Sequence, residues 1–320
     1  MSNKSIGIIY NPTSGHKFSH NYAKKSLGMF NDLLSKGGYT CRDFSAGSAF
    51  QALTNVRSAI KQKEINYLIV FGGDGMVHLG FNAVAKTNIP LGIVPVGSGN
   101  DFAKAIKIPV NNIENVIRGI SLGILHKSFK AIDCGQATPL DNNQTFSRTY
   151  FAGSLSAGLD AKINATANTL KIAPGPSRYF VAAMKELAVM QNYGYQVDYE
   201  SNKFHEAGVL CCVSNSPYIG GGIMIAPSAE VDDGKLDLIL GGKMNSMSAL
   251  RLFLKAYKGL HTKDSRVTCA QVTKVILRQL PDSKEMPFLM ADGEYVGQAP
   301  AEIEVCPKAV QIIFHPKALS

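Results

Sequence analysis

Two apolar runs that each end in a glycine turn with an aspartate constrain this chain most strongly. Tyr67 to Val70 leads into Phe71-Gly72-Gly73-Asp74-Gly75, and Leu91 to Val96 leads into Gly97-Ser98-Gly99-Asn100-Asp101, 25 residues further on. Such runs predict buried strands of a parallel sheet. At the carboxyl end of a strand, glycine lets the backbone turn sharply and exposes its N–H groups, which suits a phosphate ligand. The sequence therefore predicts a phosphate site at one edge of a sheet.

The first 130 residues alternate short β-rich runs with segments of helical period. This pattern predicts an α/β domain whose parallel sheet is covered on both faces. We expect strands at 6–10, 67–71 and 91–96, and helices at 23–34, 49–62, 77–85 and 113–120.

The sequence pattern changes after about residue 130, where short β-rich runs alternate with turn-rich stretches. This favours an antiparallel β domain, interrupted by helices at 178–190 and 247–260. We therefore predict two domains, over 1–130 and over 131–320, with a return of the last residues to the first domain left open. The ligand site is expected between them. Strands are predicted at 129–134, 149–152, 195–199, 209–213, 236–240, 272–277 and 301–305.

The charge distribution favours an anionic ligand for the first half. The net charge is +9, and residues 1–160 hold 16 Lys and Arg against 9 Asp and Glu, while residues 161–320 hold 17 against 15. Basic residues neither form long runs nor alternate with aromatic ones, so nucleic-acid binding is not predicted.

Cysteines and apolar segments indicate a protein of the cytoplasm. The six cysteines contain no Cys-x-x-Cys pair, which argues against a disulfide framework or a zinc ribbon. The apolar run at 6–10 is too short for a signal peptide. The uncharged stretch 207–229 contains Pro217 and three successive glycines, so we interpret it as strand and loop and not as a membrane span.

Four further segments carry polar chemistry. Asn11-Pro12-Thr13-Ser14-Gly15 follows the first strand, and neither a Walker motif nor a complete dinucleotide fingerprint is present. Gly220-Gly221-Gly222 predicts a flexible turn. The acidic loop Val231 to Asp237 either holds a hard cation or is a plain Asp-Gly turn. Asp292-Gly293-Glu294 places two carboxylates on one tight turn.

Together these motifs, in this order and spacing, resemble lipid kinases of the diacylglycerol and sphingosine kinase type. The resemblance spans nearly the whole chain, and its specificity lies in the ordered set, because Gly-Gly-Asp-Gly alone is shared with NAD kinases and 6-phosphofructokinases. It implies an α/β nucleotide-binding domain over 1–130, a lipid-binding β-sandwich domain over 131–320, and ATP and lipid meeting in the cleft between them.

The resemblance also implies roles for individual residues. Asp292 is expected to be the general base that accepts the proton of the lipid hydroxyl, and Asp74 to organise Mg²⁺ around the phosphates of ATP. A second, structural magnesium is expected on Asp233 and on the backbone carbonyls of Glu230 and Lys235. The nucleotide is expected to contact Asn11, Ser45, Gly72, Gly73, Asp74, Gly75, Met76, His78, Ser98 and Asn100, within a lining that runs on to Leu79.

One departure from the family pattern affects the site. The family usually continues Gly-Gly-Asp-Gly with Thr-x-Asn-Glu, whereas this chain has Met76-Val77-His78-Leu79. A hydroxyl, an amide and a carboxylate are thereby lost from the start of a helix, where they could cap N–H groups or contact the nucleotide. His78 can replace them as a donor or lie on the helix surface without a role. Weaker catalysis, a shifted nucleotide and a purely regulatory protein all fit this change.

The preferred interpretation is an ATP-dependent lipid kinase that phosphorylates diacylglycerol or a related lipid. An NAD kinase and a non-catalytic lipid-binding regulator are the alternatives. A lipid substrate implies peripheral contact with an anionic membrane at its inner face, and residues 243–278, with eight Lys and Arg and one acid, can either supply it or form a solvated helix side. The oligomeric state, a homodimer included, stays open.

Overall fold

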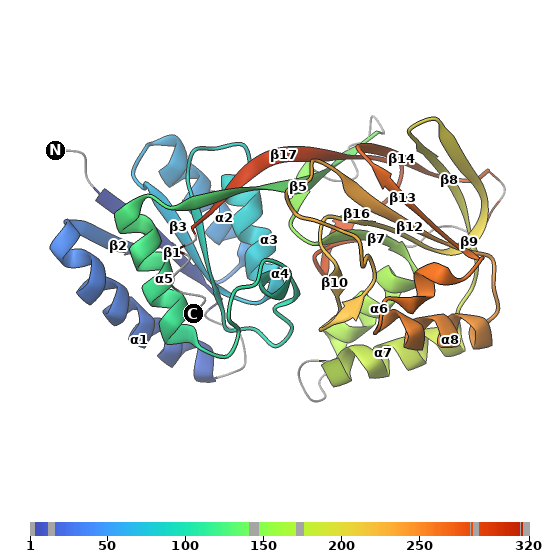
Figure 1. Cartoon of the computed structure of the whole chain (residues 1–320), viewed down its shortest axis with the longest axis horizontal. Coiled ribbons are helices and arrows are strands. Elements are labelled where there is room, and N and C mark those ends of the chain that lie inside the picture. The colour runs from blue at the N-terminus through green and yellow to red at the C-terminus, as the bar shows by residue number, and fades with distance from the viewer. Residues whose placement is uncertain are drawn as a thin grey trace. The chain divides into compact units, whose positions relative to one another are not determined.

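The computed structural model describes residues 4–11, 17–140, 147–170, 176–281, 283, 288–313 and 315. The chain forms two units, one of Met1–Ile132 with Lys308–Ser320 and the other of Asp133–Pro307. It passes from unit 1 to unit 2 within strand β5 (Phe129–Pro139) and returns within strand β17 (Ala301–Ile313), as Figure 1 shows. Binding of nucleotide by the first part and of lipid by the second stays a prediction.

Unit 1 is built on a parallel sheet. Its strands lie in the order β4, β3, β1, β2, and the end of β17 joins it beside β4, with Ile312 paired to Leu91. The strands are β1 (Lys4–Tyr10), β2 (Tyr39–Asp43), β3 (Tyr67–Gly72) and β4 (Leu91–Pro95); the helices are α1 (Lys17–Leu34), α2 (Ala49–Lys61), α3 (Asp74–Val84), α4 (Asp101–Ala105) and α5 (Ile113–His126), with a short 3₁₀ turn, η1 (Ser35–Gly37).

Helices cover both faces of this sheet. Phe30 of α1 and Ile120 of α5 belong to one core cluster with Ile8 and Ile69 of the strands. Helix α3 packs on β3 and β4, where a methyl group on Gly80 would lie 2.9 Å from the Val70 side chain. Side-chain caps start two of the helices, since Ser48 accepts the N–H of Gln51 and Asn112 that of Asn115.

Unit 2 is antiparallel. The long strand β9 lies at its centre, because it pairs with β8 and β7 on one side and with β12 on the other. The strands of unit 2, besides parts of β5 and β17, are β6 (Thr149–Phe151), β7 (Ser154–Gly158), β8 (Tyr193–Tyr199), β9 (Asn202–Ser214), β10 (Tyr218–Ile219), β11 (Ile223–Met224), β12 (Leu236–Gly242), β13 (Val267–Val272), β14 (Lys274–Gln279), β15 (Leu289–Ala291) and β16 (Glu294–Gly297).

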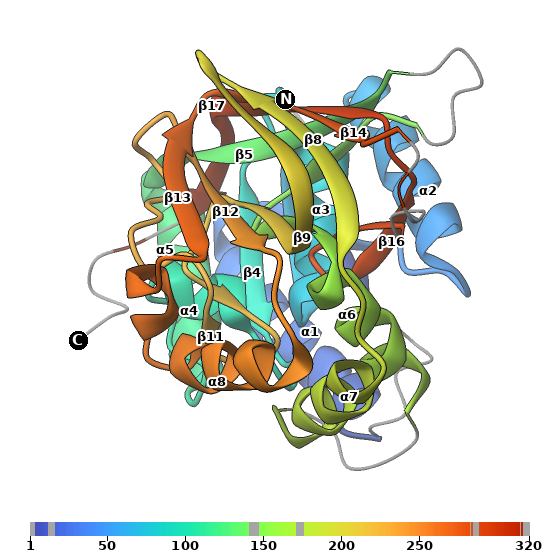
Figure 2. The ribbon, with the colours of Figure 1, turned by 90° about the vertical axis from the view of Figure 1, so that its right-hand side faces the viewer.

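Three helices lie at one end of the strands of unit 2, as Figure 2 shows. They are α6 (Leu159–Thr169), α7 (Pro176–Ala188) and α8 (Ser246–Ala256), followed by the 3₁₀ turn η2 (Leu260–Lys263). Ile163 of α6, Ala183 of α7 and Ala256 of α8 share one core cluster with Cys212 and Ile239 of the strands. A larger cluster, which includes Tyr195, Leu238 and Leu277, fills the interior between the strands.

The predicted fold class, a parallel α/β part followed by an antiparallel β part, is confirmed. Several elements were missed, among them β2, β7, β13, β15, β16, α4 and α6. Strand β2 is a partly exposed edge with polar residues, and α4 and α6 lack a clear apolar stripe. The stretch 207–229 forms the end of β9 with β10 and β11, and no helix in the described ranges is long and apolar enough to cross a bilayer.

Candidate functional site

The first group of predicted residues lies at the carboxyl edge of the sheet of unit 1. Tyr10 at the end of β1 pairs with Phe71 of β3, and Gly72 at the end of β3 pairs with Pro95 of β4. Because these strands are parallel, the segments that follow them emerge at the same edge of the sheet. Open α/β sheets bind their ligands at this edge.

The two glycine turns touch each other through their backbones. A methyl group placed on Gly97 would lie 2.3 Å from the Cα atom of Gly73 and 2.6 Å from its nitrogen. No side chain fits in that space, so the close approach requires glycine at position 97. The loops after β3 and β4 therefore form one joint surface of backbone groups.

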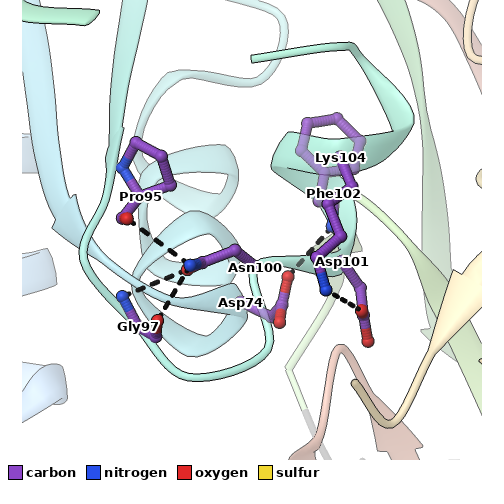
Figure 3. Close-up of polar contacts among 7 residues, drawn as sticks. All are labelled: Asp74, Pro95, Gly97, Asn100, Asp101, Phe102 and Lys104. Carbon is purple, nitrogen blue, oxygen red and sulfur yellow. Dashed lines mark hydrogen bonds and ion pairs between the residues drawn. The ribbon is translucent and has the colours of Figure 1, made fainter. Parts of the chain in front are cut away.

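Asn100 holds the second turn in shape. It has a left-handed backbone, with φ of 54°, and a buried side chain. Its Oδ1 accepts the N–H of Gly97 at 3.1 Å, and its Nδ2 donates to the carbonyl oxygens of Gly97 at 2.8 Å and Pro95 at 3.4 Å (Figure 3). Ser98, at the tip of this turn, is exposed. The structure thus gives Asn100 a local structural role, and its contact with a nucleotide stays a prediction.

Asp74 ties the two loops together. It lies in the first turn of α3, and its Oδ1 accepts the N–H of Phe102 at 3.0 Å (Figure 3). A carboxylate at a helix N-terminus is also favoured by the helix dipole. This hydrogen bond fixes the carboxylate beside the backbone surface that Gly73 and Gly97 form.

The departure at residues 76–79 has a partial structural explanation. Met76 folds over Gly72, where an added methyl group would lie 2.3 Å from Met76 Cγ, while Val77 and Leu79 are buried in the core. The partly buried His78 has its Nε2 atom 3.2 Å from Nδ2 of Asn82, which also donates to the His78 carbonyl at 3.0 Å. His78 is therefore engaged within its own helix.

Ser45 lies at the end of β1, next to Asn11. Its hydroxyl oxygen accepts the N–H of Tyr10 at 2.9 Å, and its own N–H donates to Oδ1 of Asp43 at 2.8 Å. Burial, followed by the charge of Asp43, raises the pKa of Tyr10. The structure therefore brings Ser45 to the sheet edge that also carries Asn11 and Gly72, whereas the rest of the first motif, residues 12–15, lies outside the described residues.

Replacing Gly97 by Ala is expected to damage this surface. The new methyl group meets the backbone of Gly73 and forces the two turns apart, so we expect a loss of roughly 1–3 kcal/mol in stability and weaker binding of a fluorescent ATP analogue. Gly28→Ala is the matched control, since an added methyl group there has no atom within 4 Å. Thermal unfolding and nucleotide titration of both variants test this, and a Gly97→Ala protein that matches Gly28→Ala in both would refute the role of the contact.

Asp292 in unit 2 is held in a strained turn by three main-chain donors. It follows β15 with a left-handed φ of 51°, and Gly293 follows with φ of 85°. Its Oδ2 accepts the N–H of Ala152 at 2.9 Å, and its Oδ1 accepts those of Gly153 at 2.7 Å and Ser154 at 3.1 Å. A left-handed backbone is unfavourable for most residues other than glycine, and such positions concentrate at functional sites. The carboxylate is thus fixed in position while its residue stays partly exposed.

A buried polar segment supports the loop that holds Asp292. The Gly153 carbonyl accepts the N–H groups of Asn215 at 2.7 Å and Ser216 at 3.2 Å, and the Asn215 amide donates to the Ala152 carbonyl at 2.9 Å. Asn215 and Ser216 are fully buried. Sequence reasoning missed both residues, although polar residues directly after the apolar run 209–213 were a usable signal.

The acidic loop after β11 is anchored through Gly234. The N–H of Gly234, at φ of 77°, donates to the buried Asp133 carboxylate at 2.7 Å, and the N–H of Lys235 donates to Oδ1 of Asp233 at 2.9 Å. Glu230, Asp233 and Lys235 are exposed. The oxygen atoms expected to bind the metal are the Asp233 carboxylate and the main-chain carbonyls of Glu230 and Lys235, and such oxygen ligands fit a hard cation such as Mg²⁺. In the described part of the chain, no three His, Cys, Asp or Glu side chains are grouped to hold a metal ion.

The triple glycine forms the turn of a small hairpin. Gly220, Gly221 and Gly222 all have positive φ and join β10 to β11. An added methyl group on Gly220 would lie 2.7 Å from the Tyr179 ring. The predicted flexible turn is therefore a packed one that rests on α7.

A buried acid in unit 2 was not predicted from the sequence. Asp160 lies in the first turn of α6, and its Oδ1 accepts the N–H of Ala161 at 2.9 Å, while its Oδ2 is buried without a hydrogen-bond partner among the described residues. Burial raises the pKa of Asp160 to about 7, and contacts with Ser156 and the main chain oppose this only in part. The same helix contacts the Asp292 turn, because the amide of Asn168 donates to the Gly293 carbonyl at 2.9 Å.

Comparison with known families accounts for most of the chain. Residues 5–137 match the diacylglycerol kinase catalytic domain, and residues 153–314 match the YegS C-terminal NAD kinase beta sandwich-like domain. The two matches define a class, the lipid kinases with a diacylglycerol kinase catalytic domain. Because the second match alone spans half of the 320 residues, the chain belongs to the diacylglycerol kinase-type family that combines these two domains.

Relatives along the whole length agree with this family. The chain is 28% identical to a diacylglycerol kinase of Mycobacterium tuberculosis (strain ATCC 25618 / H37Rv) over 309 residues, which covers 96% of this chain and 94% of the relative. It is 29% identical to the diacylglycerol kinase of Bacillus subtilis (strain 168), in a match that covers 93% of this chain and 92% of the relative. The crystal structure of a putative diacylglycerol kinase from Bacillus anthracis str. Sterne has the same fold, with a TM-score of 0.72 and 19% sequence identity. The match covers 99% of this chain and 98% of that one.

Proposed function

We propose that this kinase transfers the γ-phosphoryl group of Mg-ATP to a hydroxyl group of diacylglycerol or a related lipid. Diacylglycerol kinases are its relatives along more than nine-tenths of the chain, which supports this acceptor. Phosphoryl transfer depends on positioning and on charge neutralisation more than on covalent chemistry by the protein. The two units supply the groups that this reaction needs.

In this proposal, unit 1 binds the nucleotide. The touching turns at Gly73 and Gly97 offer backbone N–H groups to the phosphates, and Asn100 keeps the second turn in the shape that presents them. Bound Mg²⁺ supplies charge neutralisation at the phosphates, and Asp74 is the carboxylate that would hold it. Asn11, Ser45 and Ser98 border the same sheet edge and would contact the nucleotide, and Met76 and His78 would contact it from α3.

Unit 2 supplies the base. Asp292 would accept the proton of the attacking lipid hydroxyl, and its fixed orientation on three main-chain N–H groups is the single observation that carries the proposal. Fixing the carboxylate in advance avoids the cost of ordering it during the reaction. The exposed loop of Glu230, Asp233 and Lys235 would hold a second, structural Mg²⁺ through oxygen atoms. Peripheral contact with a membrane would give access to the lipid.

An acceptor panel tests the proposed reaction. The purified protein is incubated with ATP labelled at the γ-phosphate and Mg²⁺, with diacylglycerol, other lipids that carry a free hydroxyl group, or NAD as acceptor. We expect label in phosphatidic acid, and none when the metal is removed with EDTA. Label in NADP alone would favour an NAD kinase, and the absence of any product with nucleotide bound would favour a regulatory protein.

A further inference from the structure

Unit 2 exposes large apolar side chains on and beside two neighbouring helices. Ten such side chains are exposed among the described residues, and half of them lie between residues 176 and 260. Their exposed fractions run from 41% to 70%, which is high for residues that normally add to a core. They are Phe180, Val189, Met247, Leu254 and Leu260.

Three of these side chains lie on the helices themselves, Phe180 on α7 and Met247 and Leu254 on α8. Helices α7 and α8 pack against each other (Figure 2), and the Phe180 and Phe253 rings lie 6.2 Å apart. On α8, Ala249, Leu252 and Ala256 are buried. The opposite side carries Met247, Arg251 and Leu254 at spacings of four and three residues, so they share one exposed stripe, and the exposed Lys258 follows in the turn after α8. We call this stripe, with Lys255, Lys258 and the exposed residues of α7, the α7–α8 face.

The α7–α8 face is basic. Helix α8 contains no acidic residue, and Lys185, Lys243, Arg251, Lys255, Lys258 and Lys263 are all exposed around it. Two acids close to these residues in the sequence already have partners. Asp264 forms an ion pair with Arg266 at 2.8 Å, and Glu186 accepts the hydroxyl of Thr166 at 2.5 Å. Exposed apolar groups mixed with cations are typical of helices that lie in the interface of an anionic bilayer.

Charge complementarity decides between a bilayer and a second copy of this chain. In a twofold dimer the same patch lies on both subunits, so the basic patch with Arg251, Lys255 and Lys258 would face a second basic patch. Like charges in such a contact are repulsive. Anionic headgroups have the opposite sign, and the acyl region accepts the apolar side chains.

We propose that the α7–α8 face docks on an anionic lipid bilayer, with Met247 and Leu254 inserted at the headgroup boundary and Arg251, Lys255 and Lys258 on the headgroups. This inference rests on the proposed function, because a kinase that acts on a membrane lipid has to reach its acceptor at the bilayer. It adds the surface that makes the contact.

Co-sedimentation with vesicles tests the face directly. We expect the protein to bind vesicles of phosphatidylglycerol and phosphatidylcholine, to bind pure phosphatidylcholine weakly, and to lose binding as salt rises. Arg251→Glu/Lys258→Glu is expected to weaken binding by roughly tenfold or more, and Met247→Gln/Leu254→Gln by about tenfold. The matched controls are Lys61→Glu/Lys203→Glu, with the same change in net charge on other exposed elements, and Phe50→Gln, which replaces a side chain that is 78% exposed.

A soluble acceptor separates this inference from the proposed function. On a short-chain diacylglycerol dispersed as monomers without vesicles, the face variants are expected to retain wild-type turnover. Face variants that bind anionic vesicles as tightly as the controls would overturn the docking proposal while leaving the kinase intact. A wild-type dimer that Leu254→Gln dissociates would also overturn the docking proposal and assign the face to a second copy. Wild-type protein that does not bind anionic vesicles would overturn it as well and would leave an acidic protein as the partner.

Discussion

Asp292→Asn is expected to lower turnover of diacylglycerol by roughly 10² to 10⁴, the usual contribution of a general base. The amide has the shape of the carboxylate but does not take up the proton of the attacking hydroxyl. The amide nitrogen also takes the place of one carboxylate oxygen. It cannot accept a hydrogen bond from the main-chain N–H groups of residues 152–154, so one of these N–H groups loses its acceptor. Initial rates of phosphatidic acid formation under saturating ATP measure the effect.

The neighbouring Glu294→Gln is the control for this variant. Glu294 lies on the same turn with an exposed side chain, so the substitution removes one negative charge without touching the proposed base. We expect it to keep turnover within a few-fold of wild type. Titration with a fluorescent ATP analogue shows whether Asp292→Asn still folds and binds nucleotide in unit 1. An Asp292→Asn enzyme with near-normal turnover would remove Asp292 from the mechanism.

Asp160→Asn is expected to stabilise the protein at and above neutral pH. Burial raises the pKa of Asp160 from 3.8 to about 7, so the folded chain must either hold a proton there or bury a charge. The free-energy cost approaches about 4 kcal/mol, because each pKa unit corresponds to about 1.4 kcal/mol. Asparagine has the shape of the protonated acid and carries no such cost.

The sign of the pH dependence follows from the direction of the shift. Below the unfolded pKa near 4, Asp160 is protonated in both states and costs nothing. As pH rises from about 4 to about 7, only the unfolded chain releases the proton, so the stability of the native enzyme falls. Above the folded pKa the full penalty is present. The gain from Asp160→Asn is therefore largest above pH 7 and disappears toward pH 4.

Thermal unfolding of the native enzyme and Asp160→Asn across this pH range measures the difference. Glu206→Gln is the control, since Glu206 is an exposed acid of β9. We expect no pH-dependent gain from it. Equal unfolding temperatures of Asp160→Asn and the native enzyme at pH 8 would contradict the burial argument. A gain in stability with a loss of activity would indicate that the acid is kept for function at the expense of stability.

Much of the fold was predictable because its signals are local. The apolar runs before Gly72 and Gly97 predicted buried parallel strands, and the structure has β3 and β4 there. The turn-rich second half predicted antiparallel strands, which the structure also has. The edge strand β2 was missed, since a strand with one exposed side and polar residues has no continuous apolar run.

The candidate site was predictable only where glycine and aspartate occur together. Contacts between distant segments left no such pattern, and the N–H groups of residues 152–154 that bind Asp292 come from a loop about 140 residues away. Asn215 and Asp160 were missed for the same reason, because burial of a polar residue depends on tertiary packing. The motifs thus indicated candidate residues for the chemistry, while the groups that hold them were visible only in three dimensions.

The return of β17 to unit 1 means that no single cut yields two complete halves. A fragment that ends at residue 132 would lack the strand segment whose Ile312 pairs with Leu91 and whose Ala309 carbonyl accepts the N–H of Lys86. Its β4 would then be an uncovered sheet border, open to association with other chains. Recombinant work on unit 1 alone therefore calls for a fusion that carries residues 308–313 behind a linker.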